Sequence, residues 1–251
     1  MSKPLAYSIA QNFGPAPRQT FEVDRHYLLY AATGTMRLEA ENISWSLPPA
    51  RAALIAANNP VEVTLPVQIT CRSVLFLPEL VAPPEKVLSV FDVSPLAREL
   101  IMECGQWGAE DDPLPDYASG LFKTLASVTW KLAQSPTELH MPMARSDVVR
   151  RVLDLTEAGL VERLTFEDVA KEVAVAPRSL ARRISAELGM SWRQVLQRIR
   201  VIRAVEALSL SDQPITDIAF SQGYQSLSAF NSAFRELTGK SPSAYRASFK
   251  S

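Results

Sequence analysis

LTFEDVAKEVAVAPRSLARRISAELGMS (residues 164–191) and PITDIAFSQGYQSLSAFNSAFRELTGKS (residues 214–241) follow the same order of landmarks. Each stretch contains an apolar pair, a small residue, two apolar residues four positions apart and a closing glycine. The apolar pair and the small residue recur after 49 positions, whereas the later landmarks recur after 50. The landmarks are Val169-Ala170, Ala174, Leu180, Ile184 and Gly189 in the first copy, and Ile218-Ala219, Gly223, Phe230, Phe234 and Gly239 in the second.

This spacing predicts two helices joined by a turn in each copy. Apolar residues four positions apart form one stripe of a helix, and a glycine directly after such a stripe favours a helix end. A helix, a tight turn and a second helix together are the layout of a DNA-reading helix-turn-helix. The two recurrence distances indicate that the second copy has one residue inserted at its turn. We expect a long connecting helix over about residues 191–210 between the copies.

The composition limits the other classes. A chain of 251 residues with 47% hydrophobic residues has room for one large domain or two of ordinary size. Its start contains no apolar run typical of a signal peptide, and no segment approaches the ~18 apolar residues of a membrane span. Cys71 and Cys104 are too few for a disulfide framework or a cysteine zinc site. We therefore expect a cytoplasmic protein with no membrane partner and no cofactor.

The charge is distributed unevenly along the chain. The net charge is −1, but from Ala176 onward there are 11 Lys and Arg residues against 5 Asp and Glu residues. A basic end beside an acidic remainder is typical of a DNA-binding module attached to a domain that does not contact DNA. An ordinary solvated helical surface would have the same charges, so charge alone leaves both interpretations open.

The first half of the chain predicts a different structure. Residues 20–78 contain short apolar runs broken by Pro, Gly and Asn about every 8 to 12 residues, which is typical of a β-sandwich or small barrel. Residues 1–19 are expected to be a loosely held arm. Helical patterns follow, one capped by Ser94 and a longer one over residues 116–134. The longer helix either packs on its own β-domain or forms an antiparallel dimer contact. Its apolar stripe is Tyr117, Leu121, Leu125, Val128 and Leu132.

Turning by 100° per residue from the apolar stripes identifies the side chains that face away from each helix core. In the helix over residues 177–188, two arginines at i and i+4 are placed to pair with guanine O6 and N7 in the major groove. In the second copy, an asparagine is suited to adenine, while serine and arginine suit phosphate equally well. A merely solvated polar face is the alternative, but the duplicated helix-turn-helix favours DNA contact. The outward residues are Arg178, Ser179, Arg182 and Ser185, with Arg183 on the flank, and Ser228, Asn231, Ser232 and Arg235.

The region from about Ser146 to the end resembles the arabinose-regulator (AraC/XylS-type) transcription factors. The resemblance is carried by FEDVAKEVAVAPRSLARRISAELGMSWRQVLQRIRVIRAVEAL (residues 166–208) and DIAFSQGYQSLSAFNSAFRELTGKSPSAYR (residues 217–246). It implies base contacts at Arg178, Ala181 and Arg182 in the first copy and at Leu227, Ser228, Asn231 and Ser232 in the second. Ala181 departs from the larger polar residues often found there, and the apolar Leu227 suits only a thymine methyl group or a sugar.

The N-terminal region looks like the small cupin-type barrel that many members carry as a sensor. HYLLYAATGTMRLEA (residues 26–40), SWSLPPARAALIAANNPVEV (residues 44–63) and SPLARELI (residues 94–101) carry this looser match. It implies an effector-binding domain, with His26 and Tyr30 as candidate ligand contacts. A cupin metal centre needs two or three histidines and a carboxylate. The chain has only two histidines, and the second lies in the expected linker, so no metal site is expected.

These observations predict an α+β chain in three parts. Residues 1–134 form a cupin-like effector-binding and dimerisation domain, residues 135–145 a linker, and residues 146–251 an all-α DNA-binding domain with two helix-turn-helix units. We expect a non-enzymatic, sequence-specific transcriptional activator or repressor whose two recognition helices enter successive major grooves. The expected partners are promoter double-stranded DNA, a small-molecule effector, RNA polymerase and a second copy bound through helix 116–134. The alternative is a cupin-type enzyme whose helical tail is an interaction module.

Overall fold

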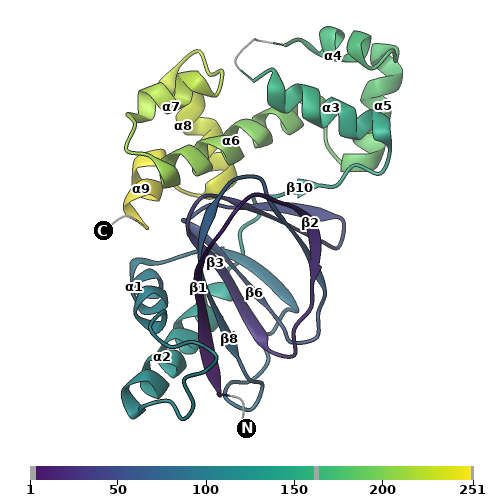
Figure 1. Cartoon of the computed structure of the whole chain (residues 1–251). Helices are drawn as coiled ribbons and strands as arrows, with labels where there is room; N and C mark the ends of the chain where they lie inside the picture. Colours follow the sequence, from purple (N-terminus) through teal and green to yellow (C-terminus); the bar gives the residue numbers. More distant parts are fainter. Residues whose placement is uncertain (1–3, 161–163, 250–251) are drawn as a thin grey trace. The chain divides into compact units, whose positions relative to one another are not determined.

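The computed structural model describes residues 4–160 and 164–249 of the chain. These residues form two compact units. The first comprises the described parts of Met1–Ala40, Trp45–Thr137 and Tyr245–Ser251, and it contains most of the β-structure. The second comprises Glu41–Ser44 and the described part of Glu138–Ala244, and it is mainly helical. The predicted α+β class is therefore confirmed, with a cupin-like β region followed by helices (Figure 1).

The β region is built as two antiparallel sheets rather than one closed barrel. One sheet has the order β1-β8-β3-β6-β9 and the other the order β10-β5-β4-β7-β2. β1 pairs with β8 along its whole length, so the expected loose arm over residues 1–19 is wrong for this segment. The strands are β1 (Ala6–Phe13), β2 (Ala16–Phe21), β3 (His26–Thr33), β4 (Met36–Ala40), β5 (Ile43–Leu47), β6 (Arg51–Ile55), β7 (Val61–Leu65), β8 (Ile69–Phe76), β9 (Leu88–Asp92) and β10 (Met141–Pro142).

Two apolar cores lie on opposite faces of the first sheet. Successive side chains of a strand point to opposite faces, so β3 supplies Tyr27 and Leu29 to one core and Leu28 and Tyr30 to the other. The core with Tyr27 fills the space between the two sheets. The core with Leu28 is covered by the helices α1 (Pro95–Cys104) and α2 (Asp116–Ala133), which lie against that face of the sheet (Figure 1).

α2 buries a face that is displaced from the predicted stripe. Its buried residues are Ala118, Phe122, Leu125, Ala126, Thr129 and Ala133. Of the predicted stripe, Leu125 is buried, Leu121, Val128 and Leu132 pack partly against the same core, and Tyr117 is 62% exposed. Small side chains therefore allow α2 to approach the sheet closely, and the larger side chains flank the contact. Of the two alternatives for this helix, packing on its own β-domain is the one that the structure shows.

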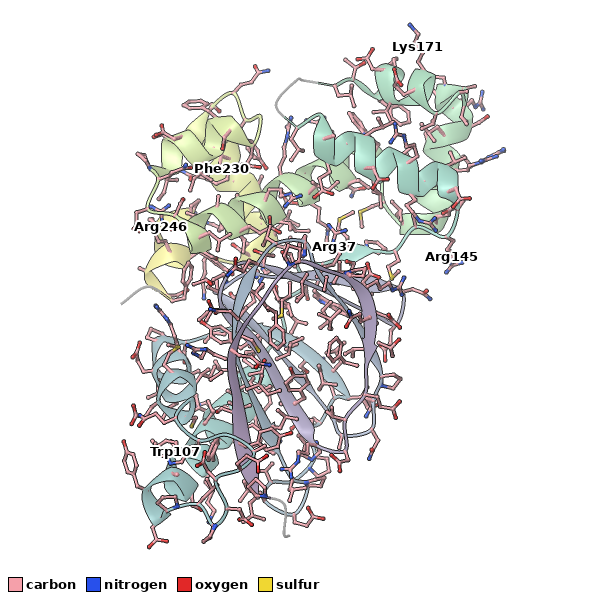
Figure 2. The ribbon with its side chains drawn as sticks, viewed as in Figure 1. Arg37, Trp107, Arg145, Lys171, Phe230 and Arg246 are labelled. Carbon is pink, nitrogen blue, oxygen red and sulfur yellow. The ribbon has the colours of Figure 1, made fainter. Side chains whose placement is uncertain are left out.

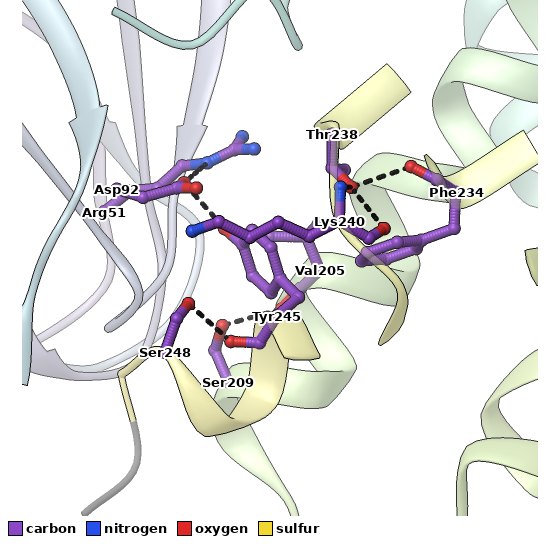
Figure 3. Close-up of polar contacts among 9 residues, drawn as sticks. All are labelled: Arg51, Asp92, Val205, Ser209, Phe234, Thr238, Lys240, Tyr245 and Ser248. Carbon is purple, nitrogen blue, oxygen red and sulfur yellow. Dashed lines mark hydrogen bonds and ion pairs between the residues drawn. The ribbon is translucent and has the colours of Figure 1, made fainter. Parts of the chain in front are cut away.

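A buried ion pair lies in the first unit at the end of β6 and β9. The guanidinium of Arg51 is 1% exposed and its Nε lies 3.3 Å from Asp92 Oδ1. Tyr245 donates a hydrogen bond of 2.8 Å from its hydroxyl to the same carboxylate oxygen (Figure 3). A buried charge is tolerated only with such partners. Burial raises the pKa of the Tyr245 hydroxyl, and the neighbouring Asp92 adds to this shift, so the phenol stays a donor.

The second unit is built around the long helix α6. α3, α4 and α5 lie at one end of it and α7 and α8 at the other (Figure 1). Ser191 caps α6 in a capping box with Gln194, which stops the chain from extending the preceding helix. The helices of this unit are α3 (Asp147–Ala158), α4 (Phe166–Glu172), α5 (Pro177–Leu188), α6 (Trp192–Leu210), α7 (Ile215–Ser221) and α8 (Leu227–Thr238). The last helix, α9 (Pro242–Ala247), begins in this unit, and its residues from Tyr245 onward belong to the first.

No helix in the described part of the chain combines the length and the apolar composition that crossing a bilayer would require.

Candidate nucleic-acid interface

The first helix-turn-helix consists of α4 and α5. Thr165 begins α4 with a capping box, in which Asp168 accepts hydrogen bonds from Thr165 and so has a lowered pKa. Ala174 has a φ of 54°, and this left-handed residue makes the turn between the helices. Val169 and Ala170 on α4 are buried against Leu180 and Ile184 on α5. The predicted landmarks are thus the residues that hold the two helices together.

The second helix-turn-helix consists of α7 and α8. Gly223 has a φ of 79°, and it lies 49 positions after Ala174 in the same place in the turn. Residues 173–176 separate the helices of the first copy, and residues 222–226 separate those of the second. The predicted one-residue insertion therefore lies in the turn. Phe230 and Phe234 are fully buried, and Figure 2 shows the Phe230 ring enclosed by this unit.

Both reading helices end in the same way. Gly189 and Gly239 have φ values of 67° and 73°, and each donates its N–H to the carbonyl four residues earlier. The left-handed conformation strains any residue with a Cβ but not glycine. The starts of the helices differ. Ser226 caps α8 by accepting a hydrogen bond from the Ala229 N–H, whereas α5 begins with Pro177 and has no side-chain cap.

α5 presents an unpaired basic surface. In the described part of the chain, the guanidinium groups of Arg178 and Arg182 make no hydrogen bond or ion pair, and both side chains are exposed. Arg183 faces Glu187 and helps to lower the pKa of that carboxyl group. Two free guanidinium groups one helical turn apart are suited to bidentate contacts with guanine or to phosphate. The predicted contact residues Arg178, Ser179, Ala181, Arg182 and Arg183 are all exposed.

α8 presents a mainly hydroxyl and amide surface. Leu227, Ser228, Ser232 and Arg235 are exposed, and Asn231 is half-buried. The guanidinium of Arg235 makes no hydrogen bond or ion pair to the residues that the structure describes, and it is one turn beyond Asn231 along the helix. The surface of α8 thus offers shorter side chains and less charge than that of α5. Leu227, at 36% exposure, is the apolar member of this set.

Glu187 joins the C-terminal end of α5 to the residues that begin α3. Its Oε2 accepts hydrogen bonds from the N–H groups of Arg145 and Ser146, at 3.0 and 2.9 Å, and its Oε1 accepts one from the Ser146 hydroxyl at 2.6 Å. Desolvation opposes ionisation of this carboxyl group, but the three hydrogen bonds prevail and lower its pKa. Sequence reasoning missed this contact, because Glu187 lies 41 positions from Ser146 and 42 positions from Arg145 along the chain.

The arginines of α6 are mostly structural. Arg198 donates to the carbonyls of Glu138 and His140, and Arg203 forms ion pairs with Glu157 and Glu206. The guanidinium of Arg200 lies 5.5 Å from the centre of the Tyr224 ring in the second turn. Burial raises the pKa of Tyr224 to about 12, although Arg200 acts in the opposite direction. Of the four arginines of α6, Arg193 is the exposed one.

The structure places the two predicted ligand contacts on the helix-facing side of β3. His26 is 3% exposed, its Nδ1 accepts a hydrogen bond from the Ala57 N–H, and its ring contacts Trp130 of α2 edge to face. Burial lowers the pKa of His26. Tyr30 is fully buried and donates its hydroxyl to the Pro49 carbonyl at 3.1 Å. Neither residue belongs to the core between the two sheets.

Nucleophiles and metal ligands are not assembled in the described residues. Cys71 and Cys104 are buried and unpaired, each in one of the two apolar cores, and burial raises the pKa of Cys104 to about 12. Cys71 is thus a core residue. Within residues 4–160 and 164–249, no group of three or more His, Cys, Asp or Glu side chains is arranged to hold a metal ion.

Known proteins are similar to this chain in sequence. The profile of the "Helix-turn-helix domain" family matches residues 169–248, which contain most of the first repeat and all of the second. The HTH-type transcriptional regulator NimR of Escherichia coli is 30% identical over 224 residues, covering 87% of this chain and 78% of NimR. The protein is an AraC-type transcriptional regulator.

Two further relatives of this AraC-type regulator are more distant. The ornithine utilization regulator of Pseudomonas aeruginosa is 32% identical over 124 residues, covering 45% of this chain and 36% of that protein. The chain thus spans about a third of the length of this relative. A solved structure of ToxT from Vibrio cholerae is 15% identical, covers 98% of this chain and 99% of that chain, and has a TM-score of 0.42. The relatives matched by sequence are regulators, which favours a regulator over a cupin-type enzyme.

Proposed function

We propose that this AraC-type regulator binds promoter DNA by inserting α5 and α8 into successive major grooves. The observation that carries the proposal is the duplication of one helix-turn-helix, with the exposed face of the second helix polar in both copies. α6 connects the two copies as one rigid helix, which suits two grooves about one turn of DNA apart (~34 Å).

Within this proposal the exposed residues divide between bases and phosphates. Arg178 and Arg182, with Ala181 between them, face the bases of the first groove, and Leu227, Ser228, Asn231 and Ser232 face those of the second. Ser179, Arg183 and Arg235 lie at the flanks of these surfaces, where the DNA backbone is within reach. The two sets do not depend on each other, so each is open to a separate test.

The regulatory part of the proposal concerns the β unit. We propose that a small effector binds there and changes promoter occupancy or the contact with RNA polymerase by shifting a conformational equilibrium. A homodimer through residues 116–134 would place Tyr117, Leu121 and Val128 at its contact, since these side chains are exposed or half-buried. The protein would act in the cytoplasm, where it meets its DNA.

A gel shift with the DNA upstream of the coding gene tests the proposal. The double variant Arg178→Ala/Arg182→Ala is expected to lose sequence-specific binding, because each bidentate contact contributes about 1–3 kcal/mol of discrimination. Arg193→Ala is the matched control, since Arg193 is an exposed arginine on α6 outside both reading helices. Specific binding that survives in the double variant would refute the assignment of α5.

A further inference from the structure

A cavity of about 600 Å³ opens in the first unit, outside the core between the sheets. It lies between α2 and the segment over residues 80–89 that leads into β9. Its volume is within the range of small-molecule sites, about 300–1,000 Å³. The space between the sheets, in contrast, is occupied by the apolar side chains of β3 to β9. The cavity is therefore the better place to look for a ligand.

The lining of the cavity combines apolar and basic side chains. Leu80, Val81, Ala126 and Trp130 supply apolar surface. Lys86, Lys123 and Lys131 supply three ammonium groups, and none of them forms an ion pair with the residues that the structure describes. Lys123, Ser127 and Lys131 follow one another at four-residue intervals, so they lie on one face of α2.

The carboxylate in the lining of the cavity already has a hydrogen-bond partner. Glu85 accepts a hydrogen bond of 3.1 Å from the side-chain amide of Gln134, and it is the carboxylate in the lining. The three lysines and the single glutamate leave the lining with an excess of positive charge beside its apolar side chains. This combination complements a molecule that has one carboxylate on an apolar body.

Trp130 connects the cavity to the sheet. Its indole Nε1 donates a hydrogen bond of 2.9 Å to the Ala82 carbonyl, which fixes the ring against the segment over residues 80–89. The opposite side of the indole contacts the rings of Phe76 and His26, at centroid distances of 5.5 and 5.9 Å. The His26 Nε2 is buried behind this ring without a hydrogen-bond partner among the described residues. A ligand that moves Trp130 would therefore change the packing of β3 and β8.

We propose that this cavity binds a small organic monocarboxylate, with its carboxylate at Lys123 and Lys131 and its apolar body on Trp130. The proposal rests on the proposed function, since it assigns the effector site and the chemical class of the effector. The face of α2 that carries Lys123, Ser127 and Lys131 differs from the one that carries Tyr117, Leu121 and Val128, as a rotation of 100° per residue shows.

Isothermal titration calorimetry of the full chain with octanoate and with 1-naphthoate tests the proposal. Saturable binding of at least one acid is expected, and it should weaken by about 10-fold or more in Lys123→Glu/Lys131→Glu, because a charge-assisted hydrogen bond is lost and a repulsive charge is added. The relative strength of the two acids distinguishes an aliphatic from an aromatic body. Lys171→Glu, an exposed lysine of α4 that projects outward in Figure 2, is the control and should bind normally.

Three results would overturn the proposal. They are no saturable binding of either acid, equal binding of 1-octanol or 1-naphthalenemethanol, and full affinity in the double glutamate variant. A concentration-dependent dimer that the double variant abolishes would assign this face to a second copy and would also overturn it. Gel shifts on the same preparations separate the two proposals. For the parent chain, a gel shift without binding of either acid removes only the cavity assignment, whereas binding of an acid without a gel shift removes the proposed function.

Discussion

The two helix-turn-helix units share one scaffold but differ in what they bury and what they expose. The first unit has an aliphatic core of Leu180, Ile184 and Leu188 and exposes a surface rich in arginine. The second has an aromatic core, in which the Phe230 ring contacts both Tyr224 and Phe234, and its reading helix exposes mainly serine, with Asn231 half-buried. Under the proposed function, the first unit therefore brings most of the positive charge to the DNA, whereas the second brings mainly hydroxyl and amide groups.

The turns show the same contrast. Ala174 accepts a left-handed conformation in open surroundings, where it is exposed. Gly223 has the same conformation, but a Cβ at this position would meet the Leu160 carbonyl and lie 2.8 Å from the Arg200 guanidinium. The second turn is thus packed against α6 through Arg200 and Tyr224. The first turn is held instead by Val173 and Val175, which pack partly against the aliphatic core.

The largest expected effect comes from exchanging these turn residues. Gly223→Ala should lower the free energy of unfolding by at least about 3 kcal/mol, since the left-handed penalty of about 1–2 kcal/mol is added to a backbone clash. Ala174→Gly should change it by no more than about 1 kcal/mol, because relief of strain and greater unfolded-state entropy oppose each other. Urea unfolding measures both. Equal effects at the two positions would show that the turns are equivalent.

The next effect concerns base recognition by the two surfaces. Arg182→Ala should weaken binding by about 1–3 kcal/mol at one base position, whereas Ser232→Ala should cost less than about 1 kcal/mol. Fluorescence anisotropy with duplexes mutated at single base pairs measures the difference. If Arg182→Ala weakens binding equally on every sequence, Arg182 contacts phosphate instead of a base.

A smaller effect is expected from the hydrogen bonds of Glu187 that join α5 to the start of α3. Because the folded-state pKa of Glu187 is lowered, its contribution to stability is present above the ordinary glutamate pKa of about 4.3 and is lost as the pH falls through the lowered value. Urea unfolding of the parent and of Glu187→Gln between pH 3 and 7 should therefore converge at acidic pH. Glu172→Gln, an exposed side chain without a hydrogen bond in the described structure, is the control. A difference in the free energy of unfolding between the parent and Glu187→Gln that does not change with pH would contradict this role of the ionised Glu187.

The smallest effect concerns the second surface. Arg235→Ala should reduce the slope of log Kd against log salt concentration by about 1 and leave the base preference unchanged, as expected for a phosphate contact. Binding titrations at several salt concentrations measure the slope. A changed base preference would place Arg235 in the groove instead and would make the two surfaces more alike.

The sequence predicted the parts of the fold that depend on local patterns. Both helix-turn-helix units, the inserted residue and the glycine helix ends follow from spacing alone, because helix periodicity and left-handed turn residues leave direct traces in a sequence. Contacts between distant segments leave no such trace. The Glu187–Ser146 hydrogen bonds and the Arg200–Tyr224 contact depend on which segments pack together. None of these residues is unusual in its local sequence.

The β unit was harder to predict for a related reason. β3 is apolar on both faces, since it is covered by the second sheet on one side and by α1 and α2 on the other. Its sequence therefore has no alternation from which to tell that His26 and Tyr30 face the helices. The pairing of β1 with β8 was missed because the polar residues of its second half are exposed at a sheet edge.

Selection of binding sites from a random duplex library tests the central claim most directly. The full chain should select two conserved blocks whose centres are about one helical turn apart, roughly 10–11 base pairs, with the stronger block contacted by α5. Arg182→Ala should erase a preference in that block and leave the other block unchanged. A single conserved block, or two blocks half a turn apart on opposite faces of the duplex, would contradict two unequal helices reading successive grooves.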